Sequence, residues 1–214
     1  MTRTAVKAYS YLRRLVKREI NYHLARPTDL LLFLTYRCTS RCKTCVMWQR
    51  KAIPDELTLS EYKKLIDTAS ENGIENVELF GGDALLRKEI LIPLVTYIKK
   101  SGIPRIYLAT NCNLLDEDTA NSLVEAGIDV FFVSLDAIGE LHDRVRGVPG
   151  TFDRVKRGME YLIKAKKGRQ CPKVIVNTTV SSLNIDEFEK IVPFALEMGA
   201  DEVAFEYVGE FHPR

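Results

Sequence analysis

Short hydrophobic segments rich in β-branched and aromatic residues recur six times along the chain, and each of the first five is followed by a segment with the apolar periodicity of a helix. The six hydrophobic segments are Leu30 to Tyr36, Val77 to Phe80, Arg105 to Ala109, Val130 to Leu135, Val174 to Val180 and Val203 to Tyr207. Each is nearly continuous in apolar residues, as expected for strands of a parallel sheet that helices cover on both faces. The alternation therefore predicts an α/β fold with six parallel strands and right-handed crossovers. Periodicity alone leaves two architectures open, a doubly wound sheet and a partial barrel.

The ends of the predicted helices carry stop and start signals. Glycine, which tolerates the left-handed conformation of a C-cap, closes the five helical segments at Gly73, Gly102, Gly127, Gly168 and Gly199. Side chains that accept hydrogen bonds from free N–H groups precede three of the segments, at Ser60, Asp116 and Asp186. These signals place the helices between the strands.

An N-terminal arm over residues 1–28 differs from the rest of the chain, so we expect a core domain over residues 29–214. From Arg3 to Leu24 the arm has apolar side chains at the spacing of one helical face, with Arg and Lys on the other. It holds seven basic side chains and a single acidic one, Glu19. Two interpretations remain: a capping helix packed on the domain, or a helix that docks on an anionic membrane surface or a partner.

Composition limits the class of protein. With 46% hydrophobic and 28% charged residues in 214, the chain has the make-up of a globular domain. Its longest apolar run, Leu30 to Leu34, is far below the roughly 20 residues of a membrane-spanning helix, and no signal peptide is evident. The net charge is +2, so the residues beyond the basic arm are acidic on balance, and we expect no nucleic-acid partner. We expect a cytoplasmic protein, peripheral to a membrane only through the arm.

Three of the five cysteines lie within eight residues. They form the segment Cys38-Thr-Ser-Arg-Cys42-Lys-Thr-Cys45, directly after the first predicted strand. An odd cysteine count without an export signal predicts reduced thiols, and clustered thiolates bind soft metals: zinc, copper(I) or an iron–sulfur cluster. Structural zinc takes four ligands, and no fourth ligand is nearby. Three protein ligands favour a cluster with one open metal position.

The C-x3-C-x2-C spacing after the first strand resembles the motif of radical S-adenosylmethionine (SAM) enzymes. The resemblance extends over nearly everything from Asp29 onward and implies a partial (β/α)6 barrel of the TIM type. It implies that Cys38, Cys42 and Cys45 hold a [4Fe–4S] cluster whose fourth iron binds SAM. In this family, reductive cleavage of SAM gives a 5′-deoxyadenosyl radical that abstracts hydrogen from a substrate.

The ends of the second and third strands extend the resemblance. Gly81-Gly82-Asp83 resembles the family's Gly-Gly-Glu, which receives the SAM amino group, although Asp83 is one methylene shorter than the usual glutamate. Thr110-Asn111 resembles the Thr-Asn near bound SAM, with Cys112 in place of a common glycine.

The fourth strand and the following segment extend it further. Ser134-Leu135-Asp136 resembles the Ser-Leu-Asp near the methionine moiety of SAM, and Arg146 occupies the arginine position of a His-Asp-x-x-Arg-Gly stretch that pairs with the SAM carboxylate. Many members have an aromatic residue immediately before the third cysteine, where this chain has Thr44. We expect Trp48 to supply the aromatic wall instead. Residues 177–179 and 205–207 correspond to positions near ribose and adenine.

The resemblance implies an enzyme that takes electrons from a low-potential donor of the flavodoxin or ferredoxin type. Its relatives process small-molecule, lipid and peptide substrates, and the sequence does not select among them. The alternative is a non-catalytic or degenerate metal-binding module, with a structural or redox-sensing cluster or zinc. Cys112 and Cys171 have no cysteine neighbour at cluster spacing, so one cluster is expected.

Overall fold

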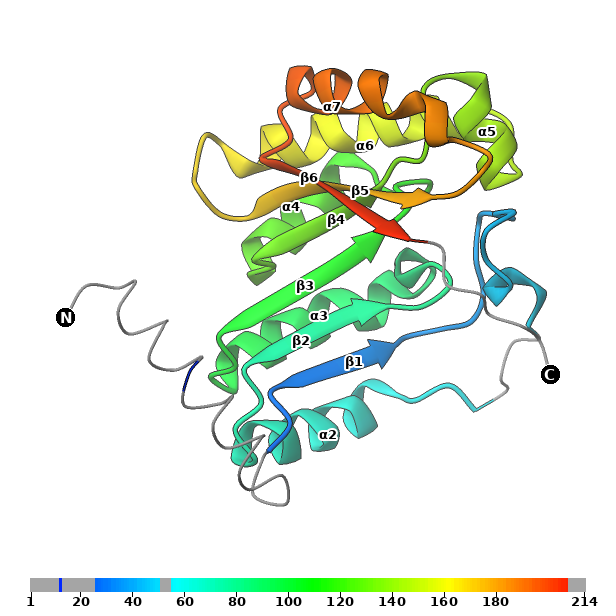
Figure 1. Cartoon of the computed structure of the whole chain (residues 1–214). Coiled ribbons are helices and arrows are strands. Elements are labelled where there is room, and N and C mark those ends of the chain that lie inside the picture. Colours follow the sequence, from blue (N-terminus) through cyan, green and yellow to red (C-terminus); the bar gives the residue numbers. More distant parts are fainter. Residues whose placement is uncertain (1–11, 13–25, 51–54, 208–214) are drawn as a thin grey trace.

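The chain forms a curved parallel sheet with its helices on one side (Figure 1). The computed structural model describes residues 12, 26–50 and 55–207. The strands are β1 (Asp29–Phe33), β2 (Asn76–Phe80), β3 (Arg105–Thr110), β4 (Val130–Ser134), β5 (Lys173–Val180) and β6 (Glu202–Tyr207). The helices are α2 (Leu59–Glu71), α3 (Lys88–Lys100), α4 (Glu117–Ala126), α5 (Glu140–Arg146), α6 (Thr151–Lys166) and α7 (Phe188–Glu197). Short 3-10 turns are η2 (Met47–Gln49), η3 (Ala84–Arg87) and η4 (Ile185–Glu187).

The strand order decides between the two predicted architectures. Every neighbouring pair is parallel, and the order is β1-β2-β3-β4-β5-β6, so spatial order follows chain order. A doubly wound sheet reverses its strand order at a switch point, which this sheet does not do. The prediction of a partial barrel of six parallel strands is confirmed.

The first strand is shorter than predicted, ending at Phe33 and not at Tyr36. Beyond that point the carbonyls of Thr35 and Arg37 accept the backbone N–H groups of Gly82 and Asp83, each at 2.8 Å. The backbone after β1 therefore turns toward the loop after β2, and the regular ladder stops.

The expectation that helices cover both faces of the sheet is wrong. The described helices lie along its outer, convex face, and none of them covers the inner face (Figure 1). In β2 the outward Val77 and Leu79 are completely buried, whereas Glu78 between them is partly exposed. On β1 the inward Leu31 and Phe33 are 55% and 42% exposed. A curled sheet encloses its concave face with its own strands, so long apolar runs do not require a second helical layer.

The core lies between the outer face of the sheet and the helices. Its fully buried side chains include Ile66 of α2, Leu91 of α3, Leu123 of α4 and Leu162 of α6. Burying a side chain of this size contributes about 1.5–3 kcal/mol. This layer holds the strand ends, and therefore the loops after them, in fixed relative positions.

The predicted N-caps are right in one case of three. Asp116 caps α4 by accepting a hydrogen bond from a backbone N–H three residues on. Ser60 is not the cap of α2; Thr58 is, in a reciprocal capping box with Glu61. Asp186 lies within η4, and α7 begins after it without a side-chain cap. All five predicted stop glycines have positive φ.

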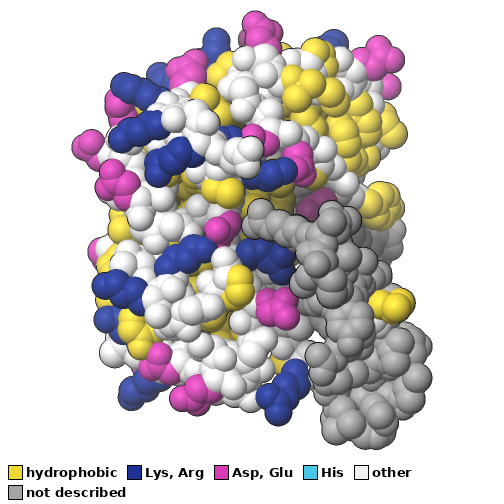
Figure 2. All heavy atoms as spheres, turned by 90° about the vertical axis from the view of Figure 1, so that its left-hand side faces the viewer, with side chains coloured by type: hydrophobic (Ala, Val, Ile, Leu, Met, Phe, Trp, Pro, Cys, Tyr) yellow, Lys and Arg dark blue, Asp and Glu magenta, His cyan; other side chains and the backbone are white. Residues whose placement is uncertain are grey.

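The prediction of a basic helical arm over residues 1–28 lies almost wholly outside the described residues. In the part of the chain that the structure describes, no helix is long and apolar enough to cross a bilayer. Figure 2 shows the face at the N-terminal ends of the strands, where described basic and acidic side chains are interspersed.

Candidate functional site

The segment after β1, residues 34–50, is here called the cysteine loop, and it lies at the C-terminal end of the sheet (Figure 1). Cys38, Cys42 and Cys45 line a single cavity of about 360 Å³. The other walls come from the ends of β2 to β6 and from α5. This is the end of the sheet where βα loops of parallel folds carry function.

The cavity brings together most of the predicted cofactor-binding residues. Six of the eight line it: Gly81, Gly82, Thr110, Asn111, Ser134 and Arg146. The side chains of the other two, Asp83 and Asp136, are 3% and 0% exposed and are not part of the lining. Their positions behind the cavity wall give them contacts with the loop and with Arg146.

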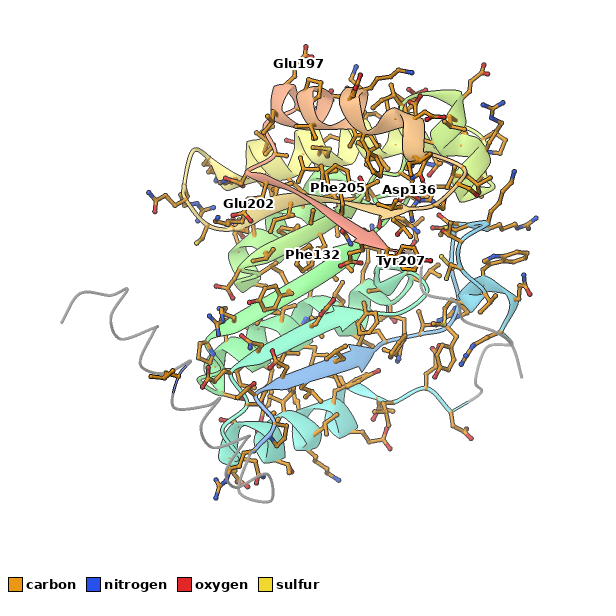
Figure 3. All side chains as sticks on the ribbon, viewed as in Figure 1. Phe132, Asp136, Glu197, Glu202, Phe205 and Tyr207 are labelled. Atoms are coloured by element: carbon orange, nitrogen blue, oxygen red, sulfur yellow. The ribbon has the colours of Figure 1, made fainter. Side chains whose placement is uncertain are left out.

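Trp48 lines the cavity as expected, and its indole N–H donates to the carbonyl of Cys42 at 3.2 Å. Among the residues expected near ribose and adenine, on β5 and β6, Thr179, Glu206 and Tyr207 line the cavity. Phe205 instead packs on Phe188 of α7, with ring centroids 4.7 Å apart. Figure 3 shows Asp136 and Tyr207 at this end of the sheet and Glu202 at the opposite end.

Two glycines allow the loop after β2 to press against the cysteine loop. A Cβ at Gly82 would overlap the carbonyl of Arg37, and one at Gly81, whose φ is +142°, would overlap that of Thr35. Any side chain at either position would push the two loops apart. The glycines therefore fix how closely the carbonyls of β2 approach the cavity.

The C-terminal end of α5 holds the other side of the cysteine loop. The last carbonyls of a helix have no partner within it, and here those of Val145 and Arg146 accept the N–H groups of Lys43 and Arg41 at 2.9 and 2.8 Å. Gly147 follows with a φ of +69°, and a Cβ there would overlap the Arg41 carbonyl. The loop is thus clamped between the end of β2 and the end of α5.

Each of the three clustered sulfur atoms faces an N–H donor. The backbone N–H of Ser40 lies 3.4 Å from Cys38 Sγ, and that of Met47 lies 3.4 Å from Cys45 Sγ. The Nη1 of Arg146 lies 3.7 Å from Cys42 Sγ. N–H groups directed at sulfur stabilise thiolate ligands and tune the metal that they hold.

The surroundings of Cys38 and Cys42 favour the protonated thiol at both positions. Burial raises the pKa of Cys38 to about 11, against the hydrogen bond from the Ser40 N–H. Burial also raises the pKa of Cys42, and the nearby Arg146 guanidinium opposes that shift. Binding a metal would therefore release protons from this loop.

Arg146 and Asp136 form a buried ion pair beside Cys42. Arg146 Nε lies 2.8 Å from Asp136 Oδ2, and the two side chains are 11% and 1% exposed. Burial alone would lower the pKa of Arg146, but the Asp136 carboxylate and Cys42 raise it above its ordinary value. The other carboxylate oxygen of Asp136 accepts the backbone N–H of Thr179 at 3.0 Å. Asp136 therefore orients the guanidinium from behind the cavity wall.

His142 is a neutral ring that contacts the backbone at Asp136. Its Nδ1 accepts the backbone N–H of Asp136 at 3.1 Å, so the ring proton is on Nε2. The side chain is completely buried. Burial, and then the charge of Arg146, lowers the pKa of His142 to about 3. The neutral imidazole is therefore the favoured form at this position.

A polar network lies beneath the first half of the cysteine loop. Asn111 Nδ2 donates to Ser40 Oγ at 3.2 Å, and Asn113 Nδ2 donates to the same oxygen at 3.0 Å. Arg154 Nε of α6 donates to Asn113 Oδ1 at 3.0 Å. Asn111 thus lines the cavity and fastens the loop, and Asn113, which the sequence reasoning missed, fastens it from behind.

Cys112 does not face the cavity. Its backbone has a φ of +58°, which explains why a glycine suits this position. Its buried thiol points toward α6, where a Cβ added to Gly158 would lie 3.0 Å from Sγ. Cys171 is exposed at the N-terminal end of β5, away from the site.

Sequence reasoning also missed three apolar lining residues, Met47, Phe80 and Ala109. Phe80 and Ala109 occupy inward positions near the ends of β2 and β3. Their alternation with buried neighbours is the signal that would have found them. Met47 lies in η2, where the sequence offers no such periodicity.

Among the described residues, no group of three or more His, Cys, Asp or Glu side chains is arranged to hold a single metal ion. The three loop cysteines nevertheless line one cavity. Structural zinc takes four protein ligands, whereas three thiols that line one cavity suit an iron–sulfur cluster with one open position.

Comparison with known families gives a match over most of the chain. The family model described as "Radical SAM superfamily" matches residues 32–195. The "AdoMet-dependent heme synthase" of Methanosarcina barkeri is 37% identical over 169 residues, covering 78% of this chain and 46% of that relative. The "Probable GTP 3',8-cyclase" of Sulfurisphaera tokodaii is 32% identical over 186 residues, covering 86% and 56%. The chain therefore spans about half the length of these curated relatives.

Solved structures share the fold at low sequence identity. SuiB of Streptococcus suis bound to S-adenosylmethionine has a TM-score of 0.76 and 17% identity, covering 98% of this chain and 48% of SuiB. The structure named anSMEcpe, with bound AdoMet and a Kp18Cys peptide, has a TM-score of 0.72 and 20% identity, covering 86% and 52%. The curled sheet of this chain is thus the core fold of these proteins.

Proposed function

The chain belongs to the radical SAM superfamily, and from that premise we propose that Cys38, Cys42 and Cys45 hold a [4Fe–4S] cluster for SAM-dependent radical chemistry. Members of this superfamily bind that cluster and SAM. When bound, the reduced cluster and SAM supply the reductive cleavage of the sulfonium C–S bond and the abstraction of hydrogen from a substrate. The observation that carries the proposal is that three thiols, each facing an N–H donor, line one cavity.

The chain's residues divide the remaining tasks among them. Gly81 and Gly82 bring backbone carbonyls to the cavity, where they suit the amino group of an amino-acid moiety. Arg146 places a guanidinium there, and guanidinium groups pair with carboxylates in a bidentate manner. Thr110 and Ser134 are the candidate hydroxyl contacts. The carbonyls and the guanidinium together match the ammonium and the carboxylate of the methionine part of SAM.

Apolar side chains close part of the same cavity. Met47 and Trp48 of the cysteine loop and Phe80 of β2 line it beside the cysteines. Reactive intermediates require the exclusion of water and of stray hydrogen donors. We assign these three side chains to that shielding role.

The electron donor and the substrate are proposed only by class. An iron–sulfur cluster of low potential needs a low-potential reductant, of the flavodoxin or ferredoxin type. The named relatives act in heme synthesis and in GTP cyclisation, and a structural neighbour binds a precursor peptide. Because these substrates differ so widely, we leave the substrate of this chain open.

Iron content after anaerobic reconstitution with iron and sulfide tests the cluster assignment. We expect about four irons and four sulfides per chain, and losses for Cys38→Ser, Cys42→Ser and Cys45→Ser. Cys171→Ser is the matched control, because that thiol is exposed and outside the site. Stoichiometric zinc without iron in anaerobically purified protein would overturn the assignment in favour of structural zinc. A cluster that forms but leaves its EPR spectrum unchanged by SAM would instead indicate a degenerate module.

A further inference from the structure

We propose that Asp83 is a positioning residue that holds the cysteine loop in shape through Thr39, and that it does not contact SAM. The inference rests on the proposed function, because it assigns a role in preparing the cluster site. It departs from the role expected of the Gly-Gly-acid segment, in which the acid receives the SAM amino group.

Both carboxylate oxygens of Asp83 already have partners on the protein. Thr39 Oγ1 donates to Asp83 Oδ2 at 2.6 Å, and the backbone N–H of Leu85 donates to Oδ1 at 3.2 Å. The side chain is 3% exposed and lies outside the cavity lining. The carboxylate is therefore committed to the loop and to the start of η3.

Thr39 lies between the first two cysteines, so its position affects both of them. Its hydroxyl has one proton to donate, and Asp83 Oδ2 at 2.6 Å is a much nearer acceptor than Asn111 Oδ1 at 3.4 Å. The same oxygen accepts the side-chain amides of Asn111 and Asn113, each at 3.1 Å. A hydroxyl has one donor and two acceptor positions. The Thr39 hydroxyl is therefore fully used, and Asp83 is the partner that sets the direction of its O–H.

Backbone contacts in the same place support this role. The N–H of Asp83 donates to the carbonyl of Arg37 at 2.8 Å, and the Cys38 thiol faces the Gly82 carbonyl at 3.2 Å. Asp83 thus contacts the residues on either side of Cys38, Arg37 through its backbone and Thr39 through its side chain. Loss of the side-chain contact leaves Asp83 with only its backbone contact to the loop.

The length of the side chain follows from this geometry. A glutamate is longer by one C–C bond, about 1.5 Å. With the backbone held against Arg37, the longer carboxylate cannot keep the 2.6 Å contact unless Thr39 moves. The shorter acid at this position is therefore matched to the loop.

A double-mutant cycle in the cluster-free chain tests the contact directly. We expect Thr39→Val and Asp83→Asn each to raise the unfolding equilibrium constant about tenfold or more. In the double variant this constant should rise by much less than the product of the two single effects. Thr119→Val is the control, because it removes a buried threonine hydroxyl of α4 that has no contact with the loop. When Thr119→Val is combined with Asp83→Asn, the two effects on the unfolding equilibrium constant should multiply. If the effects of Thr39→Val and Asp83→Asn multiplied in the same way, the proposal would be overturned.

Loading experiments separate positioning from SAM binding. We expect Asp83→Glu and Thr39→Val to take up severalfold less iron than the wild type, and the loaded fraction of Asp83→Asn to bind SAM with an affinity within about threefold of wild type. If Asp83 were a SAM ligand, Asp83→Asn would keep its iron and lose SAM affinity, and Asp83→Glu would retain both; that result overturns the proposal. Failure of the wild type to form a cluster would overturn the proposed function alone, since the unfolding cycle needs no cluster.

Discussion

At the scale of single residues, the site depends on a pair of buried charges. Asp136 and Arg146 lie behind and beside Cys42 with almost no exposure. A buried charge left without its partner costs far more than the pair itself contributes. The chain therefore needs both members, whatever the guanidinium binds in the cavity.

We expect the removal of one member of this pair to cause a large loss of stability. Arg146→Met should lower the free energy of unfolding by about 3–5 kcal/mol, because it leaves the Asp136 carboxylate buried and unpaired. Arg146→Met combined with Asp136→Leu should recover most of that loss. Urea denaturation of the cluster-free chain measures both. A double variant as unstable as the sum of the single variants would contradict this account.

The buried neutral ring of His142 predicts a pH dependence of stability. The pKa is about 3 in the folded chain, below its ordinary value of 6.5, so the unfolded chain binds the extra proton between these values. Its contribution is complete above pH 6.5 and is lost as the pH falls toward 3, by at most about 1.4 kcal/mol per pH unit. Between pH 7 and 5, wild type should lose about 2 kcal/mol more than His142→Gln in urea denaturation. Equal losses would show that His142 does not titrate in this way.

The residues of the cavity were predictable where a motif marks a strand end, as at Gly81, Thr110 and Ser134. The direction of a side chain was not predictable in the same way. Asp83 follows the cavity residue Gly82, and Asp136 lies two residues after the cavity residue Ser134. Both side chains nevertheless point behind the cavity wall, because each has a hydrogen-bond donor on that side. Those donors, on Thr39 and Thr179, come from segments far away in the sequence.

At the scale of elements, helix starts are set by backbone geometry as well as by residue type. Thr58 has an extended backbone and reaches the N–H of Glu61, so α2 begins after it. Ser60 has an equally suitable side chain but already lies inside the helix. This is why only one predicted N-cap of three is correct, although the strands were placed to within a few residues.

The α2 capping box predicts a local stability effect. Thr58→Ala should lower the free energy of unfolding by about 1 kcal/mol, because it removes the side-chain acceptor for the Glu61 N–H. Ser60→Ala is the matched control and should change it by less than about half as much. Thermal or urea denaturation distinguishes them. If Ser60→Ala were the more costly variant, the cap would be misassigned.

At the scale of the whole molecule, a one-sided helical layer leaves the concave face of the sheet to the strands themselves. The six parallel strands were predictable because each is a compact apolar run. The curl was not, since an apolar run has the same pattern whether helices or opposing strands cover its second face. Membership of the radical SAM superfamily, which the cysteine spacing indicated, is confirmed over residues 32–195.

The architecture places the cysteine loop, the ends of β2 to β6 and the end of α5 around one cavity. Each of these segments is anchored by the core or by hydrogen bonds to its neighbours. We propose that this cavity carries out SAM-dependent radical chemistry. The chain spans about half the length of its curated relatives, so the claim concerns SAM cleavage and leaves the substrate open.

The formation of 5′-deoxyadenosine by the anaerobically reconstituted chain, with SAM and dithionite, tests this claim most directly. We expect wild type and Cys171→Ser to release 5′-deoxyadenosine and methionine, and Cys42→Ser to release neither. A wild-type chain with a full complement of iron and sulfide that cleaves no SAM would contradict it.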